Sequence, residues 1–493
     1  MLLLLLLACP APKPVEIPDD TADSGDTAPD STDTTDSADS GDSADSTDTT
    51  DSGDTTDTTE TDTGEPPPDS LGALSLTVDP DVVTVLHAAF TDPTGHEAWV
   101  EYRFEDDAWL VAPVIGPGDA VLLGIPAETP VEARAAARWG DTTVYSEVAT
   151  ATTGPLPDDL LLPNVVLWDP TRAWEADYVM VSVDHAAYTY SPPWWIEIFD
   201  REGRIVWYLE VPDDHMSFYP TVAFDGTHIW WDGANFFGMS STPGRVVRQT
   251  LDGRWRVDQT VPGSPGEAIA EGPDGSFYYE DRGGVGYGLS QLLPDGTTTR
   301  IWDCGAYMAE LGVEARECFL NTCNWSEEHG TILASSFTSD TVYEVDVATG
   351  EVVRQMGQLE VGDPWSFDPA DRVFEYQHDP MWLDNGNLLV STHQPGQSGV
   401  QIAAEYRVDD ATHTLTREWS YTSTDMWATQ MGEALRLPNG NTVQGYGQDG
   451  ALREVTTDGQ IAFQASWEKD SQGYRVVGHA SFLPDLYALN VGR

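Results

Sequence analysis

Asp384-Asn385-Gly386-Asn387, followed directly by Leu388-Leu389-Val390, is one copy of the repeat that decides the fold. An Asn-Gly or Asp-Gly pair between two apolar stretches is the strongest short-range signal of a β-hairpin. The same order of turn and strand recurs at Phe224–Thr227, Pro273–Ser276, His329–Thr331 and Pro438–Asn441. These copies predict a series of hairpins between residues 160 and 493.

A second turn pattern alternates with the first along the same region. Its six copies are Asp200–Trp207, Leu251–Trp255, Leu293–Gly296, Ala348–Val353, Asp409–Thr412 and Thr457–Phe463. Two hairpins in every ~50 residues make one four-stranded blade, and a ring of such blades is a β-propeller. The predicted fold class is therefore all-β, with a six-bladed β-propeller over residues 160–493. Val179–Ser182 is expected in the first blade, and the strand that completes the ring can come from either end of this region.

Residues 71–155 have the pattern of a separate all-β domain. Stretches such as Ala73–Val78, Val82–Phe90 and Ala98–Phe104 alternate between apolar and polar residues, as half-buried strands do. Seven short strands in this length predict a β-sandwich. The segments Leu123–Val131 and Ser146–Gly154 resemble a fibronectin type III domain, a class of module that spaces or binds.

Residues 10–70 form an Asp/Ser/Thr-rich segment that is expected to be a disordered acidic spacer. An Asp recurs at every third position from Asp30 to Asp57, and no apolar residue larger than Ala occurs there, so no core can form. Repulsion between like charges extends such a chain. Calcium capture by the aspartates is the alternative, but calcium loops need Gly-directed turns and carbonyl ligands.

Residues 1–9 have the pattern of an export signal. Met1 is followed by six leucines, a run too short to cross a bilayer as a helix, and then by Ala8 and Cys9. Leu6-Leu7-Ala8-Cys9 resembles the bacterial lipoprotein signal, in which the Cys is lipidated. We expect an exported chain anchored through Cys9 to the bacterial outer membrane or cell surface. A misassigned start site is the alternative, because no basic residue precedes the leucines.

Charge and cysteine content exclude some classes of function. The net charge is −60, which excludes nucleic-acid binding through a basic face. Cys304, Cys318 and Cys323 lie close together, and one disulfide among them is expected in an oxidising compartment, with the pairing open. Their spacing does not match a zinc site, so the sequence predicts no metal centre.

One family shares the motifs of the propeller region. The stretch Gln377–Leu389, reading QHDPMWLDNGNLL, resembles the QHD…NGN blade motif of bacterial arylsulfotransferases. Leu320–Trp325 with Gly330–Ser336 resembles the preceding blade of that family, and Gly432–Thr442 resembles the last one. The similarity covers about 300 residues in the same motif order.

The resemblance implies an activity and a nucleophile. Members of the family move a sulfuryl group between phenols without a nucleotide donor or other cofactor, through a covalent intermediate on a histidine of the central channel. His378 occupies the position of that nucleophile. A neutral imidazole suits this step because it is nucleophilic near neutral pH. A small phenolic ligand is the implied partner.

The chain departs from the family at the positions that hold the sulfate oxygens. Phe319 stands in place of a His, Phe337 in place of an Arg, and Glu267 is an acid at the corresponding place in an earlier blade. His393 stands where the family has a polar Asn, and Asn321 keeps the Asn of its motif. We expect all of these side chains to line one axial channel with His378.

These departures leave two main hypotheses and one weaker one. The first is a sulfotransferase that uses His378, and the second is a propeller without catalytic activity that binds a ligand or protein at the cell surface. The third is a hydrolase or lyase that uses Glu267 and Asp379 as paired carboxylates.

Other residues of the propeller region have two interpretations each. Arg282, Arg436 and Arg475 are candidate replacement cations, and inter-blade salt bridges are the alternative. The pairs Trp194-Trp195 and Trp230-Trp231 are predicted to pack in blade cores, and lining a phenol or sugar site is their alternative.

Overall fold

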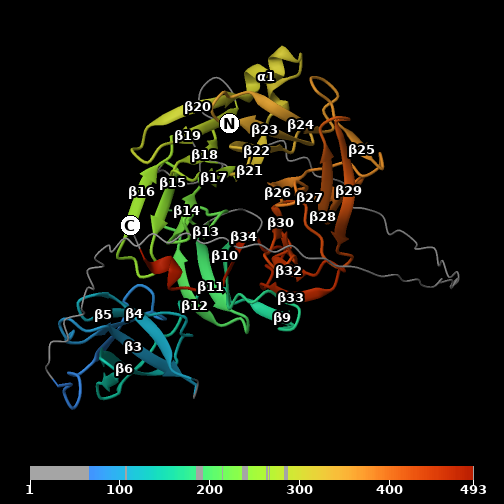
Figure 1. The fold of residues 1–493 in the computed structure, drawn as a ribbon. Helices are drawn as coiled ribbons and strands as arrows, with labels where there is room; N and C mark the ends of the chain where they lie inside the picture. Colours follow the sequence, from blue (N-terminus) through green and yellow to red (C-terminus); the bar gives the residue numbers. More distant parts are fainter. Residues whose placement is uncertain are drawn as a thin grey trace, which may run out of the picture. The chain divides into compact units, whose positions relative to one another are not determined.

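The structure is a computed structural model that describes residues 66–105, 108–184, 193–213, 215–235, 243–262, 265, 267–281 and 287–491. The predicted signal segment, Cys9 and the spacer up to residue 65 lie outside the described residues. Six sheets follow one another around a ring, so the six-bladed β-propeller and the all-β class are confirmed (Figure 1). No helix in the described part of the chain is long and apolar enough to cross a bilayer.

Three blades are built from four consecutive antiparallel strands each. Blade 2 contains β13 (Thr221–Val222), β14 (Ile229–Gly233), β15 (Arg245–Gln249) and β16 (Arg256–Thr260). Blade 3 contains β17 (Ile269–Glu271), β18 (Phe277–Glu280), β19 (Gly288–Leu292) and β20 (Thr298–Asp303). Blade 4 contains β21 (Leu320–Ser326), β22 (Thr331–Ser336), β23 (Thr341–Asp346) and β24 (Val352–Gly357).

Blades 5 and 6 carry a fifth strand. Blade 5 contains β26 (His378–Trp382), β27 (Leu388–Gln394), β28 (Gln397–Asp409) and β29 (Thr414–Thr422), and the short β25 (Ser366–Asp368) pairs in parallel with β29. Blade 6 contains β30 (Gly432–Arg436), β31 (Thr442–Tyr446), β32 (Ala451–Val455) and β33 (Ile461–Ser466), and β9 (Asn164–Trp168) pairs with β33.

Both ends of the propeller region take part in closing the ring. Blade 1 is formed by β12 (Ile205–Glu210), β11 (Trp194–Asp200) and β10 (Tyr178–Asp184), and its fourth strand is the C-terminal β34 (Val477–Leu483). The strand that completes the first blade therefore comes from the end of the chain, while β9 from the start extends the last blade. A short 3₁₀ helix, η4 (Ala488–Asn490), follows β34.

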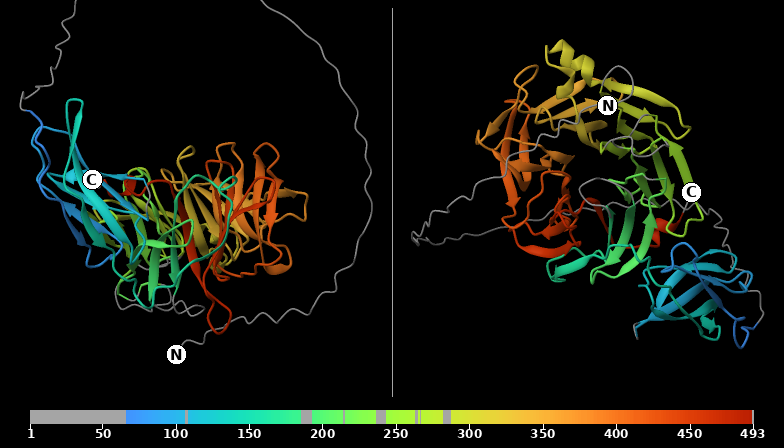
Figure 2. Two further views of the ribbon diagram at one scale, coloured as in Figure 1. Left: turned by 90° about the horizontal axis from the view of Figure 1, so that it is seen from below. Right: turned by 180° about the vertical axis from the view of Figure 1, so that it is seen from behind.

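The first strands of the blades surround the centre of the ring. Strand β21 lies against β17 and β26, and β26 lies against β30. Figure 2 shows the blades radiating from this centre when the ring is viewed from behind. We call the set of side chains at the starts of these strands the hub.

Large aromatic residues fill the spaces between neighbouring blades. Trp194, Trp195, Trp230 and Trp231 are all less than 5 % exposed, so the prediction that they pack in blade cores is confirmed. Trp194 meets Phe218 edge to face, with ring centroids 5.2 Å apart, and Trp230 meets Phe277 in the same way at 5.0 Å. These two contacts join blade 1 to blade 2 and blade 2 to blade 3.

Residues 75–152 contain eight strands around a separate apolar core. They are β1 (Ser75–Val78), β2 (Leu86–Ala89), β3 (Ala98–Phe104), β4 (Leu110–Gly116), β5 (Asp119–Leu122), β6 (Pro130–Trp139), β7 (Thr142–Tyr145) and β8 (Ala149–Thr152). Strand β4 pairs with both β3 and β5, so seven strands follow one path in the order β1-β2-β5-β4-β3-β6-β7, and β8 pairs with β6. Membership of the fibronectin type III class stays a prediction.

One disulfide closes the segment that leads into blade 4. Helix α1 (Cys304–Glu310) and the 3₁₀ helix η3 (Ala315–Glu317) precede β21, and Cys304 is bonded to Cys318. Cys323 on β21 is a buried free thiol. The structure thus decides between the pairings that the sequence left open.

Candidate functional site

The hub is built from equivalent positions of the repeat. In blades 2, 3, 5 and 6 the first strand runs into a turn in which a glycine N–H donates to the carbonyl of the residue three before it; the accepting residues are Ala223, Gly272, Leu383 and Leu437. Leu483-Pro484-Asp485, which begins at the last residue of β34, matches Leu437-Pro438-Asn439 in blade 6. Counting back from these residues aligns the hub positions of five blades.

Two successive levels of side chains follow from this alignment. Five residues before the turn stand Phe218, Glu267, His378, Gly432 and Gly478, and four residues before it stand Tyr219, Ala268, Asp379, Glu433 and His479. We call these the first and second levels of the hub. The polar members of each level contact one another across blades, as the distances below show.

The first level contains the predicted nucleophile. His378 Nε2 lies 3.3 Å from Glu267 Oε2, and the two side chains are 8 % and 17 % exposed. His378 Nδ1 is buried without a hydrogen-bond partner among the described residues. The fold therefore brings His378 and Glu267 together as an imidazole–carboxylate pair.

His393 lies in β27, the strand that pairs with β26 and so neighbours His378. It is 3 % exposed, and its Nδ1 has no hydrogen-bond partner among the described residues. Burial lowers the pKa of His393 to about 4, and the neighbouring His378 contributes to this shift. At neutral pH this imidazole is uncharged, so it cannot serve as a cation for an anionic ligand.

The other predicted channel residues form a separate aromatic contact. Phe319 and Phe337 meet edge to face with centroids 4.9 Å apart, and both rings are half-buried. Asn321 donates from Nδ2 to the backbone carbonyl of Gln377 at 2.8 Å, next to His378. Phe319 therefore contacts Phe337, and His378 contacts Glu267. That all of these side chains line one axial channel stays a prediction.

The candidate replacement cations have other partners. Arg436 Nη2 donates to Glu405 Oε2 at 2.7 Å, and Arg475 donates to the backbone carbonyls of Asp184 and Glu468 at 2.6 and 2.7 Å. Arg282 lies outside the described residues. Among the residues that line the described hub, no Arg or Lys is present to hold a sulfate.

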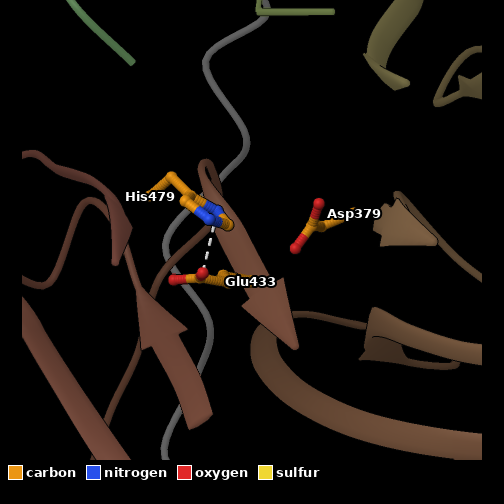
Figure 3. A group of neighbouring side chains, drawn as sticks. All are labelled: Asp379, Glu433 and His479. Carbon is orange, nitrogen blue, oxygen red and sulfur yellow. Dashed lines mark ion pairs between the residues drawn. The ribbon is translucent and has the colours of Figure 1, made fainter. Parts of the chain in front are cut away.

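The second level brings together three ionisable groups from three blades. Asp379 of β26, Glu433 of β30 and His479 of β34 place one ligand atom each within 4.8 Å of one another (Figure 3). His479 Nδ1 and Glu433 Oε1 are 2.8 Å apart. The Asp379 and Glu433 side chains are buried, and His479 is 14 % exposed.

Surrounding polar groups hold this triad in place. Asn324 donates from Nδ2 to Asp379 Oδ1 at 2.8 Å, and the backbone N–H of Ala480 donates to Glu433 Oε2 at 3.1 Å. The backbone N–H of His479 donates to the carbonyl of Phe218 at 2.7 Å. The Tyr219 ring stacks on the imidazole of His479 with centroids 5.4 Å apart. The three side chains are therefore positioned by neighbours on other strands.

The electrostatics of the hub favour positive charge. Burial works against the charged form of His479, but the Glu433 carboxylate and Asp379 outweigh it and raise the pKa of His479 to about 9. Burial raises the pKa of the Tyr219 hydroxyl, and the carboxylates of Asp379, Glu267 and Glu433 raise it further. A cation is stabilised in this environment and an anion is repelled.

Three cavities meet at His479. The largest, about 490 Å³, lies at the ends of β21 and β26 and is lined by Asn324, Trp325, Ser326, Glu327, Glu328, Asp379, Met381, Trp382, Leu383, Asp384, Leu435 and His479. We call it the Trp325 pocket. A second cavity of about 200 Å³ shares Asn324, Trp325 and His479 with it. A third, of about 10 Å³, reaches from His479 to His378.

Glu433, His479, Tyr219 and Asn324 were not predicted as site residues. The signal for the first two was present in the repeat, because Glu433 stands four residues before Leu437 as Asp379 stands four before Leu383. His479 has the same relation to Leu483. Aligning the turns rather than the family motif finds them.

Comparisons with known proteins assign neither a family nor a function to this chain. No protein-family profile matches the chain, and no curated protein matches it. Among solved structures it is similar to TolB from Acinetobacter baumannii, with 12% identity over 79% of this chain and 83% of that one and a TM-score of 0.41. A protein of unknown function from Bacteroides caccae is 15% identical over 62% and 98% of the two chains, with a TM-score of 0.39. A streptogramin B lyase is 12% identical over 64% and 90%, with a TM-score of 0.35. Similarities of this size assign no function to the chain.

Proposed function

We propose that this protein is a ligand-binding propeller whose Trp325 pocket takes a small aromatic molecule that carries an amine or no charge. The observation that carries the proposal is the composition of that pocket. Trp325, Trp382 and Met381 supply apolar and aromatic surface, while the ionisable groups at its lining are acids and a single His. A volume of about 490 Å³ lies within the range of ordinary small-molecule sites.

The charges of the pocket favour an amine over a sulfate. Glu327, Glu328 and Asp384 are exposed at the lining, and Asp379 stands further in. An ammonium group gains from these carboxylates, and the tryptophans add apolar surface for its aromatic ring. A sulfate ester meets the same carboxylates as like charges.

Sulfuryl transfer through His378 is the second candidate function. The buried pair of His378 and Glu267 favours it, because a nucleophilic imidazole is commonly oriented by a carboxylate. Against it, Phe319 and Phe337 contact each other where the resemblance implies sulfate-holding side chains. Each lost donor of this kind costs about 2.7–4 kcal/mol of transition-state stabilisation.

A binding experiment separates the two candidates. Isothermal titration of the full chain in the presence of a chelator compares tyramine, phenol and phenyl sulfate. We expect affinity in the order tyramine, phenol, phenyl sulfate. Trp325→Leu is expected to weaken tyramine binding about tenfold, whereas Trp168→Leu, at an exposed tryptophan of β9, leaves it unchanged.

Two outcomes of these measurements contradict the ligand-binding proposal. Tighter binding of phenyl sulfate than of tyramine contradicts the proposal. Release of nitrophenolate from 4-nitrophenyl sulfate in the presence of phenol, abolished in His378→Ala, establishes the sulfotransferase instead. Circular dichroism of each variant shows that the fold is kept.

We propose further that the chain is exported and held at the cell surface through a lipid on Cys9. The support is the sequence Leu6-Leu7-Ala8-Cys9 after the leucine run. Labelling of expressing bacteria with an alkyne fatty acid is expected to mark the wild-type chain and not Cys9→Ser. Equal labelling of both chains rejects the anchor.

A further inference from the structure

The second level of the hub contains a set of groups that the ligand-binding proposal does not use. Asp379, Glu433 and His479 come from three different blades, and each offers a ligand atom within 4.8 Å of the other two. The sequence alone predicted no metal centre, because the three residues are far apart in the chain and follow no metal-binding spacing. Ring closure by β34 brings the third of them to the first two.

Two buried carboxylates at this distance need positive charge between them. Asp379 is 4 % exposed and Glu433 is 5 % exposed. Burying an ionised carboxylate is costly unless it is paired or coordinates a metal. Within the triad, a single imidazole faces both acids. A divalent cation compensates both carboxylates at once.

We propose that Asp379, Glu433 and His479 bind a divalent first-row transition ion such as Zn²⁺ or Mn²⁺. One nitrogen and two oxygen ligands suit these ions, whereas an all-oxygen set suits Mg²⁺ or Ca²⁺. Ligand atoms lie about 2.0–2.2 Å from Zn²⁺, so two ligand atoms of a tetrahedral site are about 3.3–3.6 Å apart. The ligand atoms of the triad lie within 4.8 Å of one another, and side-chain movements of about 1 Å bring them into that range.

The surroundings of the triad are those of a metal site with an open position. Asn324 holds one oxygen of Asp379, and Ala480 N–H holds Glu433, which is how outer contacts orient metal ligands. Three protein ligands leave at least one position free. Asp379 and His479 line the Trp325 pocket, so that position opens toward a cavity of about 490 Å³.

Direct titration tests the site on the full chain. Protein freed of metal by a chelator and then dialysed is titrated with ZnCl₂ and with MnCl₂ by calorimetry, without any aromatic ligand. We expect one tight site per chain above the weak binding of the Asp-rich segment, which is the same in every variant. Asp379→Asn and Glu433→Gln are expected to lower the affinity of the tight site about 100-fold or more.

A variant of a nearby carboxylate tests whether metal binding depends on the position of the acid and not only on its negative charge. Asp384→Asn removes an exposed carboxylate of the same pocket and is expected to keep the tight site. Absence of a tight site in the wild-type chain overturns the proposal, as does its persistence in Asp379→Asn.

X-ray absorption at the zinc edge of the loaded chain gives an answer that does not depend on variants folding. One imidazole nitrogen among oxygen ligands is expected, and a shell of oxygens alone overturns the assignment. These experiments contain no aromatic molecule, so their outcome is independent of the ligand-binding proposal.

Discussion

Consecutive side chains of β26 both reach the hub, which a regular strand does not allow. Successive side chains of a strand point to opposite faces. Asp379 has a left-handed backbone, with φ of +53°, and the pairing of β26 with β27 is irregular between His378 and Met381. This local break lets His378 meet Glu267 in one level and Asp379 meet Glu433 and His479 in the next. An Asp tolerates this conformation better than most residues.

His393 makes the stability of the fold depend on pH. Its pKa is about 4 in the folded chain, below the 6.5 of an exposed imidazole, so the unfolded chain binds a proton first as the pH falls. The free energy of unfolding therefore drops between pH 6.5 and 4, by up to roughly 3 kcal/mol from this residue. In His393→Gln this part of the pH dependence is expected to disappear. Urea unfolding at a series of pH values measures it.

The control for this experiment is His413→Gln. That variant makes the same exchange of imidazole for amide at a side chain that is 44 % exposed in the turn between β28 and β29. Identical pH profiles for His393→Gln and the wild type are incompatible with a buried neutral His393.

Strand β34 closes the ring, and the contribution of its packing to the free energy of unfolding can be measured. Leu483 is 1 % exposed at the end of β34, within the largest apolar cluster. Leu483→Ala is expected to lower the free energy of unfolding by about 2–5 kcal/mol, because it leaves a cavity where blade 1 is completed. Urea unfolding monitored by tryptophan fluorescence gives the value.

Val353→Ala is the matched change at an exposed site. Val353 lies on β24 with 49 % of its surface exposed, and its truncation should change stability by less than about 0.5 kcal/mol. A loss in Leu483→Ala no larger than this one means that β34 does not secure the ring.

The disulfide before blade 4 can be verified by counting thiols. Cys304 and Cys318 are bonded, and Cys323 is fully buried. Among these three residues we expect alkylation to label none in the native protein and only Cys323 in the unfolded, unreduced protein. Peptide mapping by mass spectrometry identifies the labelled residue. Labelling of Cys304 or Cys318 without a reductant contradicts the pairing.

The hairpins could be predicted because their signal is local. Asn-Gly and Asp-Gly turns such as those at Gly386 and Gly440, where φ is +78° and +88°, need no distant partner to be recognised. The pairing of β34 with β10 and of β9 with β33 was not determined by the sequence, because it joins segments separated by most of the propeller. The sequence indicated only that a strand from one end of residues 160–493 completes the ring, and it did not say which end.

The candidate site could be predicted only in part, because some of its residues lie in local motifs and others come from a distant segment of the chain. His378 and Glu267 carry motif positions, and the fold places them 3.3 Å apart. His479 lies in no motif that the resemblance supplied, and it joins Asp379 only when the last strand of the chain enters the first blade. The second level of the hub is thus assembled by ring closure, and the motifs of the resemblance alone did not show it. Its equivalence across blades becomes visible once the turns are aligned.

The acidity of the chain predicts how salt affects the folded protein. The chain carries 83 Asp and Glu against 23 Lys and Arg, and acids outnumber bases within residues 160–493 as well, so like charges repel across the ring. Screening this repulsion should stabilise the fold, because the screening length falls from about 30 Å at 0.01 M salt to about 3 Å at 1 M. The urea midpoint is therefore expected to rise with NaCl over this range. EDTA in every sample removes any contribution from metal binding, and KCl at equal ionic strength should give the same rise. A midpoint that falls with salt would mean that exposed ion pairs, such as that of Arg204 with Glu105, stabilise the fold more than the net charge destabilises it.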